Sequence, residues 1–129
     1  MAPVRVIRGS GAWQDALPQI RALCSSPLFL GRSSATQPLR NTLISSLTSA
    51  GMKVAPALLR HDCCNEDLSR LQAEWSVHRS DGVIAAGGGK VLDAGKLLAD
   101  RLDLPCITVP LSASTCAGWT ALSNLYSPD

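Results

Sequence analysis

The sequence predicts a single α/β domain in which a parallel sheet carries helices on both faces. Short β-type runs alternate with longer segments of helical periodicity along the chain. The length of 129 residues and the hydrophobic content of 46% suit one domain with a substantial core. Strands that alternate with helices usually become neighbours in a parallel sheet, because the helices carry the chain back across its faces. We therefore expect one domain spanning residues 1–129.

Short apolar runs bounded by turn residues are predicted as strands. They are residues 4–8, 27–31, 53–59, 83–86, 105–109 and 121–126. Apolar residues three and four apart predict helices between the first five of these runs. In the first helix, Pro18 is expected near the start or at a kink. Gly51 is expected directly after the end of the second helix.

The composition excludes several classes of protein. The net charge is only +2 and the 12 Lys and Arg residues are scattered, so no nucleic-acid partner is predicted. No apolar run approaches a membrane-spanning length, and no membrane partner is predicted. Arg5 and Arg8 interrupt the apolar stretch at the N-terminus, which argues against a secretory signal. A cytoplasmic location is expected.

The five cysteines form neither a zinc-binding nor a disulfide pattern, because their number is odd and no CxxC pair occurs. Free thiols in a reducing compartment are expected. Cys106 falls in a predicted strand and is expected to be a small core residue. Cys116 lies in a polar loop.

A glycine turn joins the fourth predicted strand to the helix after it. It consists of Gly87, Gly88 and Gly89, followed by Lys90. Glycines let the backbone approach a ligand without hindrance from Cβ atoms. The free amides and positive dipole end of the helix suit a phosphate, and Lys90 adds a full charge. The turn thus predicts an anion-binding site.

Neither common phosphate-binding motif is present at this turn. A GxGxxG motif would need glycine at Leu92, and a P-loop would need glycine at Ile84 and Ser or Thr at Val91. A tight turn that binds no ligand therefore stays open as an alternative. Asp93 could equally serve to stabilise the helix dipole.

A polar loop, residues 112–118, follows the next predicted strand. Its hydroxyls can bond a phosphate, a ribose or a carboxamide, or they can cap the turn. The carboxyl ends of parallel strands open on the same edge of a sheet, where ligands bind. This loop and the glycine turn are therefore expected on one edge.

The segment GGGKVLDAGK, residues 87–96, resembles the GGGKTLDTAK segment of glycerol dehydrogenases, in the iron-containing alcohol dehydrogenase superfamily. The segments LPCITVP at 104–110, SAST at 112–115 and ALSNLYSPD at 121–129 are similar to those that follow in that family. The resemblance covers essentially the whole chain and is strongest over residues 82–129. It implies a Rossmann-like domain that binds NAD or NADP.

The resemblance also implies the residues that contact the cofactor. The pyrophosphate would lie on Gly87, Gly88, Gly89 and Lys90, and Asp93 would support this turn. The nicotinamide end would be lined by Ser114, Thr120, Leu122 and Tyr126. Members of the family oxidise an alcohol or polyol by hydride transfer to NAD, with a zinc or iron ion polarising the substrate oxygen.

Two departures from the family pattern bear on specificity. Arg32 stands where the family has an acid that bonds the adenosine ribose. With Ser33 and Ser34 beside it, Arg32 suits a 2′-phosphate, so NADP is the alternative to NAD. Cys116 replaces an aspartate associated with the polyol, which puts glycerol itself in doubt, because a thiol accepts hydrogen bonds poorly. Leu111 likewise replaces a threonine and removes a hydroxyl from the cofactor site.

A third departure concerns the metal. In the family an aspartate and histidines of a helical second domain hold it, and this chain stops before that domain. His61 and His78 lack ligand spacing, so no metal ligand is assigned. We expect the cofactor-binding domain of a metal-dependent alcohol or polyol dehydrogenase, inactive alone, with zinc or iron only in a full-length relative.

Two other interpretations stay open. A stand-alone nucleotide-binding or interaction module without catalysis could cover its exposed apolar face by forming a homo-oligomer. A lyase of the dehydroquinate synthase type has a similar nucleotide loop, although the ALSNLYSPD segment argues against it.

Overall fold

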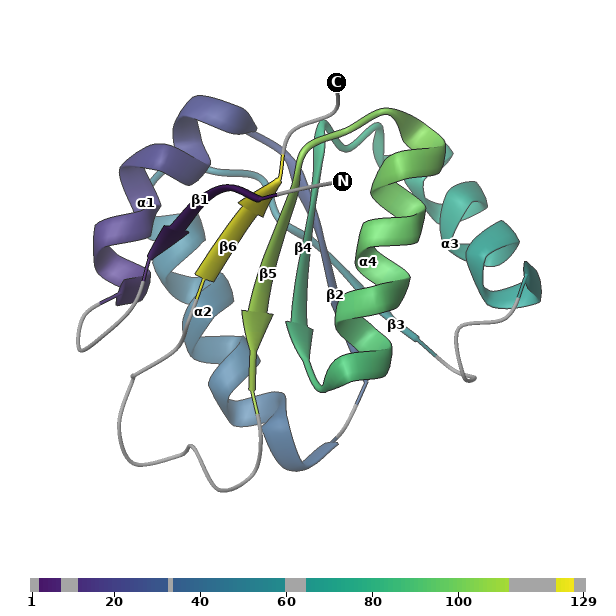
Figure 1. Ribbon diagram of the computed structural model, residues 1–129, viewed down its shortest axis with the longest axis horizontal. Helices are drawn as coiled ribbons and strands as arrows, with labels where there is room; N and C mark the ends of the chain where they lie inside the picture. The colour runs from purple at the N-terminus through teal and green to yellow at the C-terminus, as the bar shows by residue number, and fades with distance from the viewer. Residues whose placement is uncertain (1–2, 8–11, 33, 60–64, 112–122, 127–129) are drawn as a thin grey trace.

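The computed structural model describes residues 3–7, 12–32, 34–59, 65–111 and 123–126 (Figure 1). The strands form one six-stranded sheet in the order β1-β6-β5-β4-β2-β3. They are β1 (Pro3–Ile7), β2 (Pro27–Gly31), β3 (Ala55–Leu58), β4 (Gly82–Gly87), β5 (Cys106–Pro110) and β6 (Ser123–Tyr126). The helices are α1 (Ala12–Leu23), α2 (Gln37–Ser49), α3 (Asn65–His78) and α4 (Gly89–Leu102), with a 3-10 turn, η1 (Ser34–Thr36), before α2.

The predicted parallel sheet is confirmed for four strands. β2 pairs in parallel with β3 and β4, and β4 pairs in parallel with β5. The two remaining strands differ from the prediction, since β6 pairs antiparallel with both β5 and β1. Parallel neighbours need a crossover connection, which is usually a helix. The sequence between β5 and β6 has the composition expected of a polar loop rather than of a crossover helix, which is consistent with the antiparallel pairing of these two strands.

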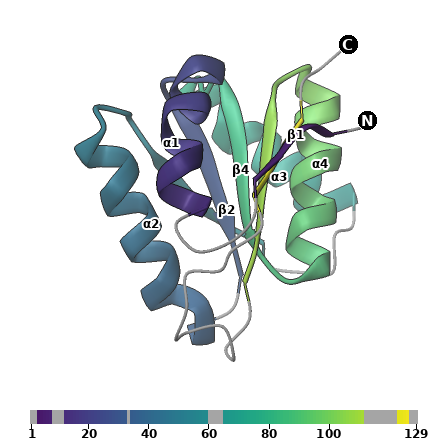
Figure 2. The ribbon, with the colours of Figure 1, turned by 60° about the vertical axis from the view of Figure 1, so that its left-hand side comes forward.

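Helices cover both faces of the sheet, as predicted. Helices α1 and α2 lie on one face, and α3 and α4 lie on the other (Figure 2). An apolar cluster fills the space on each side. Phe29 of β2 belongs to the α1–α2 cluster, whereas its neighbour Leu28 belongs to the α3–α4 cluster. Successive residues of β2 thus point to opposite faces and tie both layers to one strand.

The predicted details of the first two helices have different outcomes. Gly51 follows the C-cap residue Ala50 of α2 with a φ of 91°, a left-handed conformation that favours glycine, as predicted. Pro18 lies in the middle of α1, so the expectation that it lies near the start is wrong, and the alternative of a kink stays a prediction. Its ring is exposed, while Ala16 and Ile20 beside it are fully buried. Packing of that apolar face outweighs the unfavourable effect of a proline inside a helix.

The buried cysteines are core residues. Cys106 in β5 is fully buried, as predicted, and burial raises the pKa of its thiol to about 12. Cys24 packs in the α1–α2 cluster, and burial followed by the nearby charge of Asp81 raises its pKa to about 12. Both thiols therefore stay protonated near neutral pH. In the described ranges, no helix combines the length and apolar character needed to cross a bilayer.

Candidate functional site

The order of the parallel strands reverses between β2 and β4. From β2 the chain moves to β3 on one side, and it then returns past β2 to β4 and β5 on the other. The helix after β2 lies on one face and the helix after β4 lies on the opposite face (Figure 2). At such a reversal the connections diverge and leave a crevice beyond the carboxyl ends of the strands, where α/β proteins bind ligands.

A cavity of about 240 Å³ lies at this reversal. We call it the switch cavity. Its lining residues are Arg32, Gly87, Gly88, Gly89, Lys90 and Val91. The fold therefore brings Arg32, which directly follows β2, next to the glycine turn that follows β4. All of these residues except Val91 are among those that the sequence predicts for cofactor binding, and their binding role stays a prediction.

The glycine turn is open toward a ligand. Gly88 and Gly89 are exposed, and a Cβ atom added to either would meet no other atom within 4 Å. Gly87 has a φ of 155°, and a Cβ atom there would lie 3.2 Å from the side chain of Val91. Glycine is thus required at position 87 by the chain itself, whereas at 88 and 89 the chain leaves space that a phosphate could use.

Helix α4 begins at this turn. Gly88 is the N-cap residue in an extended conformation, with a φ of −82°, and as a glycine it has no side chain that could cap the helix. The first amides of a helix have no acceptor within the helix. Here those amides belong to residues that line the switch cavity, and Lys90 adds a positive charge beside them. The site can therefore bind an anion through backbone amides, the helix dipole and one ammonium group.

The end of β5 holds the glycine turn in place. The amide of Leu111 donates a hydrogen bond of 2.9 Å to the carbonyl oxygen of Gly87. The Leu111 side chain is buried in the α1–α2 cluster. Leu111 therefore supports Gly87 through its backbone amide, while its apolar side chain packs in the core. This role does not need the hydroxyl of the threonine that the family resemblance implies at this position.

The other predicted site residues lie elsewhere or outside the described residues. Asp93 is exposed on α4, with its Oδ1 3.8 Å from Nζ of Lys96, and it does not line the switch cavity. Tyr126 is the last residue of β6, where it is paired with Cys106 and Pro3. Outside the described residues are Ser114, Cys116, Thr120, Leu122 and His61.

Sequence reasoning missed Arg40. This residue of α2 is only 4% exposed, and its Nη1 donates a hydrogen bond of 2.5 Å to Oγ1 of Thr36. Its guanidinium packs against Gly31, where a Cβ atom would collide with it. Burial lowers the pKa of Arg40. The sequence contains one indication that Arg40 is buried. Arg40 lies three residues before Leu43 and seven before Leu47, and this spacing places it on the buried face of the helix.

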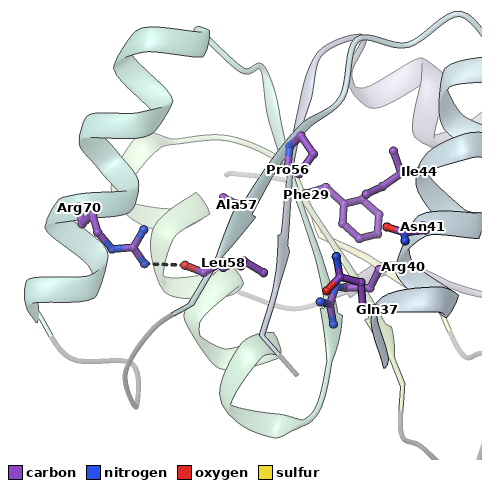
Figure 3. Close-up of a pocket in the computed structure, with 9 residues that line it drawn as sticks. All are labelled: Phe29, Gln37, Arg40, Asn41, Ile44, Pro56, Ala57, Leu58 and Arg70. Carbon is purple, nitrogen blue, oxygen red and sulfur yellow. Dashed lines mark hydrogen bonds between the residues drawn. The ribbon is translucent and has the colours of Figure 1, made fainter. Parts of the chain in front are cut away.

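A second cavity, of about 300 Å³, lies between α2 and strands β2 and β3 (Figure 3). We call it the α2 cavity. Phe29 and Pro56 line it from the two strands, and Arg40 lines it from α2. Arg70 of α3 reaches the same region, and its Nη2 donates a hydrogen bond of 2.6 Å to the carbonyl oxygen of Leu58. Cationic side chains thus occur at the ends of both β2 and β3.

The described residues do not fit a catalytic metal. Among them, no three His, Cys, Asp or Glu side chains are close enough to hold an ion. The two described cysteines, Cys24 and Cys106, are buried in opposite layers. A catalytic metal would therefore need ligands from outside the described residues.

Comparison with known proteins adds the family to this geometry. The sequence profile of iron-containing alcohol dehydrogenases matches residues 3–129. The chain belongs to the iron-containing alcohol dehydrogenase family. It corresponds to the N-terminal portion of family members, as the sequence motifs predict.

Individual members of the iron-containing alcohol dehydrogenase family show the extent of the match. An uncharacterized oxidoreductase of Synechocystis sp. is 36% identical over 127 residues, which cover 98% of this chain and 32% of the relative. A glycerol-1-phosphate dehydrogenase [NAD(P)+] of Methanothrix thermoacetophila is 31% identical over 129 residues, covering 95% of this chain and 35% of the relative.

A solved structure supports the fold. Glycerol dehydrogenase from Schizosaccharomyces pombe superposes with a TM-score of 0.71 at 21% identity, over 81% of this chain and 26% of that one. The chain thus spans about a third of the length of the curated relatives that it matches.

Proposed function

We propose that this chain is the nucleotide-binding portion of a metal-dependent alcohol or polyol dehydrogenase. In this proposal it binds a nicotinamide dinucleotide, with the pyrophosphate on the glycine turn of the switch cavity. The observation that carries the proposal is the position of this turn. It combines exposed glycines, an uncapped helix N-terminus and Lys90 at the point where the strand order reverses.

The roles of the residues follow from their places. The amides at the start of α4 and the Lys90 ammonium would hold the pyrophosphate, and Leu111 would keep Gly87 in position through its hydrogen bond. The bound nicotinamide supplies hydride transfer. The proposed contacts of the nicotinamide, Ser114, Thr120, Leu122 and Tyr126, rest on the family resemblance alone. The metal and the groups that bind the alcohol would come from the part of the relatives that this chain does not cover.

Alanine substitutions at Gly88 and Gly89 test this proposal. Since a Cβ atom at either position meets no atom of the chain within 4 Å, both variants should fold normally. The added methyl group would occupy space that the pyrophosphate needs, so we expect at least an approximately tenfold loss of dinucleotide affinity, equivalent to about 1.4 kcal/mol. The measurement is an NMR titration of the 129-residue chain with NAD⁺ and NADP⁺, followed through the glycine amides.

Ser45→Ala, an exposed change on α2 at a residue that lines neither cavity, is the matched control and should bind as the wild type does. Circular dichroism spectra of all variants should superpose. Unchanged affinity in G88A and G89A, or shifts confined to residues far from the glycine turn, would contradict the proposal.

A further inference from the structure

The switch cavity contains a group that the pyrophosphate does not need. Arg32 follows Gly31, the last residue of β2, and it lines the same cavity as the glycine turn at the end of β4. Strands β2 and β4 are hydrogen-bonded neighbours. When a pyrophosphate rests on the turn after one strand, the adenosine ribose reaches the carboxyl end of the neighbouring strand. Arg32 is therefore placed where the ribose 2′ position would lie.

The side chain at that place decides which dinucleotide fits. A carboxylate there accepts hydrogen bonds from the ribose hydroxyls of NAD and repels a 2′-phosphate, whereas an arginine accommodates the phosphate. Guanidinium groups bind phosphate oxygens through two parallel hydrogen bonds. Arg32 is exposed, so its long side chain can adjust to a ligand that enters from solvent.

The charge of the surrounding residues points in the same direction. Among the described residues, the switch cavity is lined by two cations, Arg32 and Lys90, and by no acidic residue. The described lining of the α2 cavity likewise contains two cations, Arg40 and Arg70, and no acidic residue. A phosphomonoester adds about −1.5 to −2 charges at neutral pH. The edge formed by β4, β2 and β3 therefore carries cationic side chains at the end of β2 as well as at the glycine turn.

Arg40 keeps the end of β2 in position. Its buried guanidinium covers Gly31 and is bonded to Thr36, so the residue directly before Arg32 is held against α2. Arg40 thus packs under the end of β2, whereas Arg32 is exposed and lines the switch cavity.

We infer that Arg32 recognises a 2′-phosphate on the adenosine ribose, so that this chain prefers NADP to NAD. The inference rests on the proposed function and names the cofactor of the same site. It makes Arg32 a specificity-determining residue and assigns the phosphates of the ligand to separate places, with the pyrophosphate on the glycine turn and the 2′-phosphate at the end of β2.

The test compares ligands that differ only in the 2′-phosphate. The 129-residue chain is titrated with NADP⁺ and NAD⁺, and with adenosine 2′,5′-bisphosphate and adenosine 5′-monophosphate, using calorimetry and NMR. We expect the ligand with the 2′-phosphate to bind more tightly in each pair. Arg32→Ala should weaken NADP⁺ binding about 10- to 100-fold, the range expected for a hydrogen bond to a charged group, and should leave NAD⁺ affinity within about twofold. Arg32→Asp should reverse the preference.

Arg101→Ala is the control for overall charge. Arg101 lies in the last turn of α4, at the opposite end of that helix from the switch cavity, and its removal changes the net charge by the same amount. We expect it to leave the ratio of NADP⁺ to NAD⁺ affinity unchanged.

Each other outcome has a distinct meaning. Equal binding of both dinucleotides, or tighter binding of NAD⁺, would overturn the inference and leave the proposed function standing. A similar loss for both ligands in R32A would place Arg32 on the pyrophosphate and also overturn it. Absence of binding by either dinucleotide would overturn the proposed function, and the inference with it.

Discussion

The side chain of Asp81 links the segments that lead into strands β2 and β4. Its carboxylate accepts hydrogen bonds from the amides of Ser25 and Ser26, and the bond from Ser26 is the shortest, at 2.7 Å. It also accepts a hydrogen bond of 3.0 Å from the Ser25 hydroxyl. The amide of Asp81 in turn donates to the carbonyl oxygen of Ser26 at 3.1 Å. These bonds join the residues before β2 to those before β4. They set the amino ends of the two strands whose carboxyl ends border the switch cavity.

The charge of Asp81 should make the stability of the fold depend on pH. Partial burial by itself raises the pKa of Asp81, but the hydrogen bonds from Ser25 and Ser26 outweigh it, so the pKa lies below its ordinary value. The unfolded chain, with a pKa of about 3.9, therefore binds the proton more readily than the folded chain. The stabilisation is present above about pH 4 to 5 and is lost as the pH falls through the lowered value.

Asp81→Asn should accordingly lower the free energy of unfolding by about 1 to 3 kcal/mol at pH 7, because hydrogen bonds to a charged acceptor are replaced by weaker ones. The difference from the wild type should shrink as the pH falls from 5 to about 2. Urea unfolding at several pH values measures it. Asp100→Asn, an exposed change on α4, is the control. A difference that does not depend on pH would show that the Asp81 charge does not contribute.

At the level of single residues, the sequence predicts the parts of the candidate site that depend on local chemistry. Three adjacent glycines before a helix predict an anion site from local chemistry. Arg32 is a candidate only through the family resemblance, because it stands where the family has an acid. Arg40 could not be found in this way, because a buried arginine depends on a partner and a space that only the packed structure provides.

Helix α4 is the element on which the site depends, because its first residues form the glycine turn. It packs on β4 through Gly95, which faces Ala85 so closely that a Cβ atom on Gly95 would collide with the Ala85 methyl group. The helix axis can therefore lie near the strand, which holds the turn over the carboxyl end of β4. A glycine in the middle of a helix is unfavourable by itself, and here close packing accounts for it.

Gly95→Ala should destabilise the fold by about 1 to 2 kcal/mol, because overpacking exceeds the roughly 1 kcal/mol that alanine gains in helix propensity. Gly89→Ala is the matched control on the same helix, since nothing lies within 4 Å of a Cβ atom there. Adding Ala85→Gly to G95A should recover part of the loss. Chemical unfolding measures all three, and a G95A variant as stable as the wild type would show that the contact relaxes without strain.

The sequence predicts the elements better than their directions. Alternating strands and helices predict the parallel part of the sheet and the helices on both faces, because a helical crossover almost requires a parallel neighbour. The sequence predicts β1 and β6 as strands, at residues 4–8 and 121–126, but it does not predict their antiparallel pairing. Their pairing places Val6 opposite Asn124. A local sequence pattern cannot predict a contact between residues so far apart along the chain.

For the molecule as a whole, the proposal separates cofactor binding from turnover. The described residues offer no site for a catalytic metal, and the chain spans about a third of the length of its curated relatives. We expect the 129-residue chain to bind a nicotinamide dinucleotide and to oxidise no alcohol or polyol when zinc or iron is supplied. Absorbance at 340 nm measures turnover, with a full-length relative as the positive control.

Metal-dependent turnover by the chain alone would contradict this expectation. Turnover that persists unchanged in G88A and G89A at a subsaturating dinucleotide concentration would also contradict the assignment of the pyrophosphate to the glycine turn. Light scattering in the same samples would separate a monomeric cofactor-binding portion from a self-associating module, which is the alternative that the sequence leaves open.

The pairing of β1 with β6 also fixes an order of events during synthesis. Residues 3–7 leave the ribosome before the other described residues, but their partner strand, residues 123–126, leaves after the rest of the described chain. At typical synthesis rates the interval between β1 and β6 is on the order of ten seconds. For roughly the last second of it, after residues 106–110 have emerged, β5 lacks its neighbour on one side. A strand edge with free amides and carbonyls is a template for pairing with other chains. The nascent chain is therefore most exposed to misassociation just before its last described strand emerges.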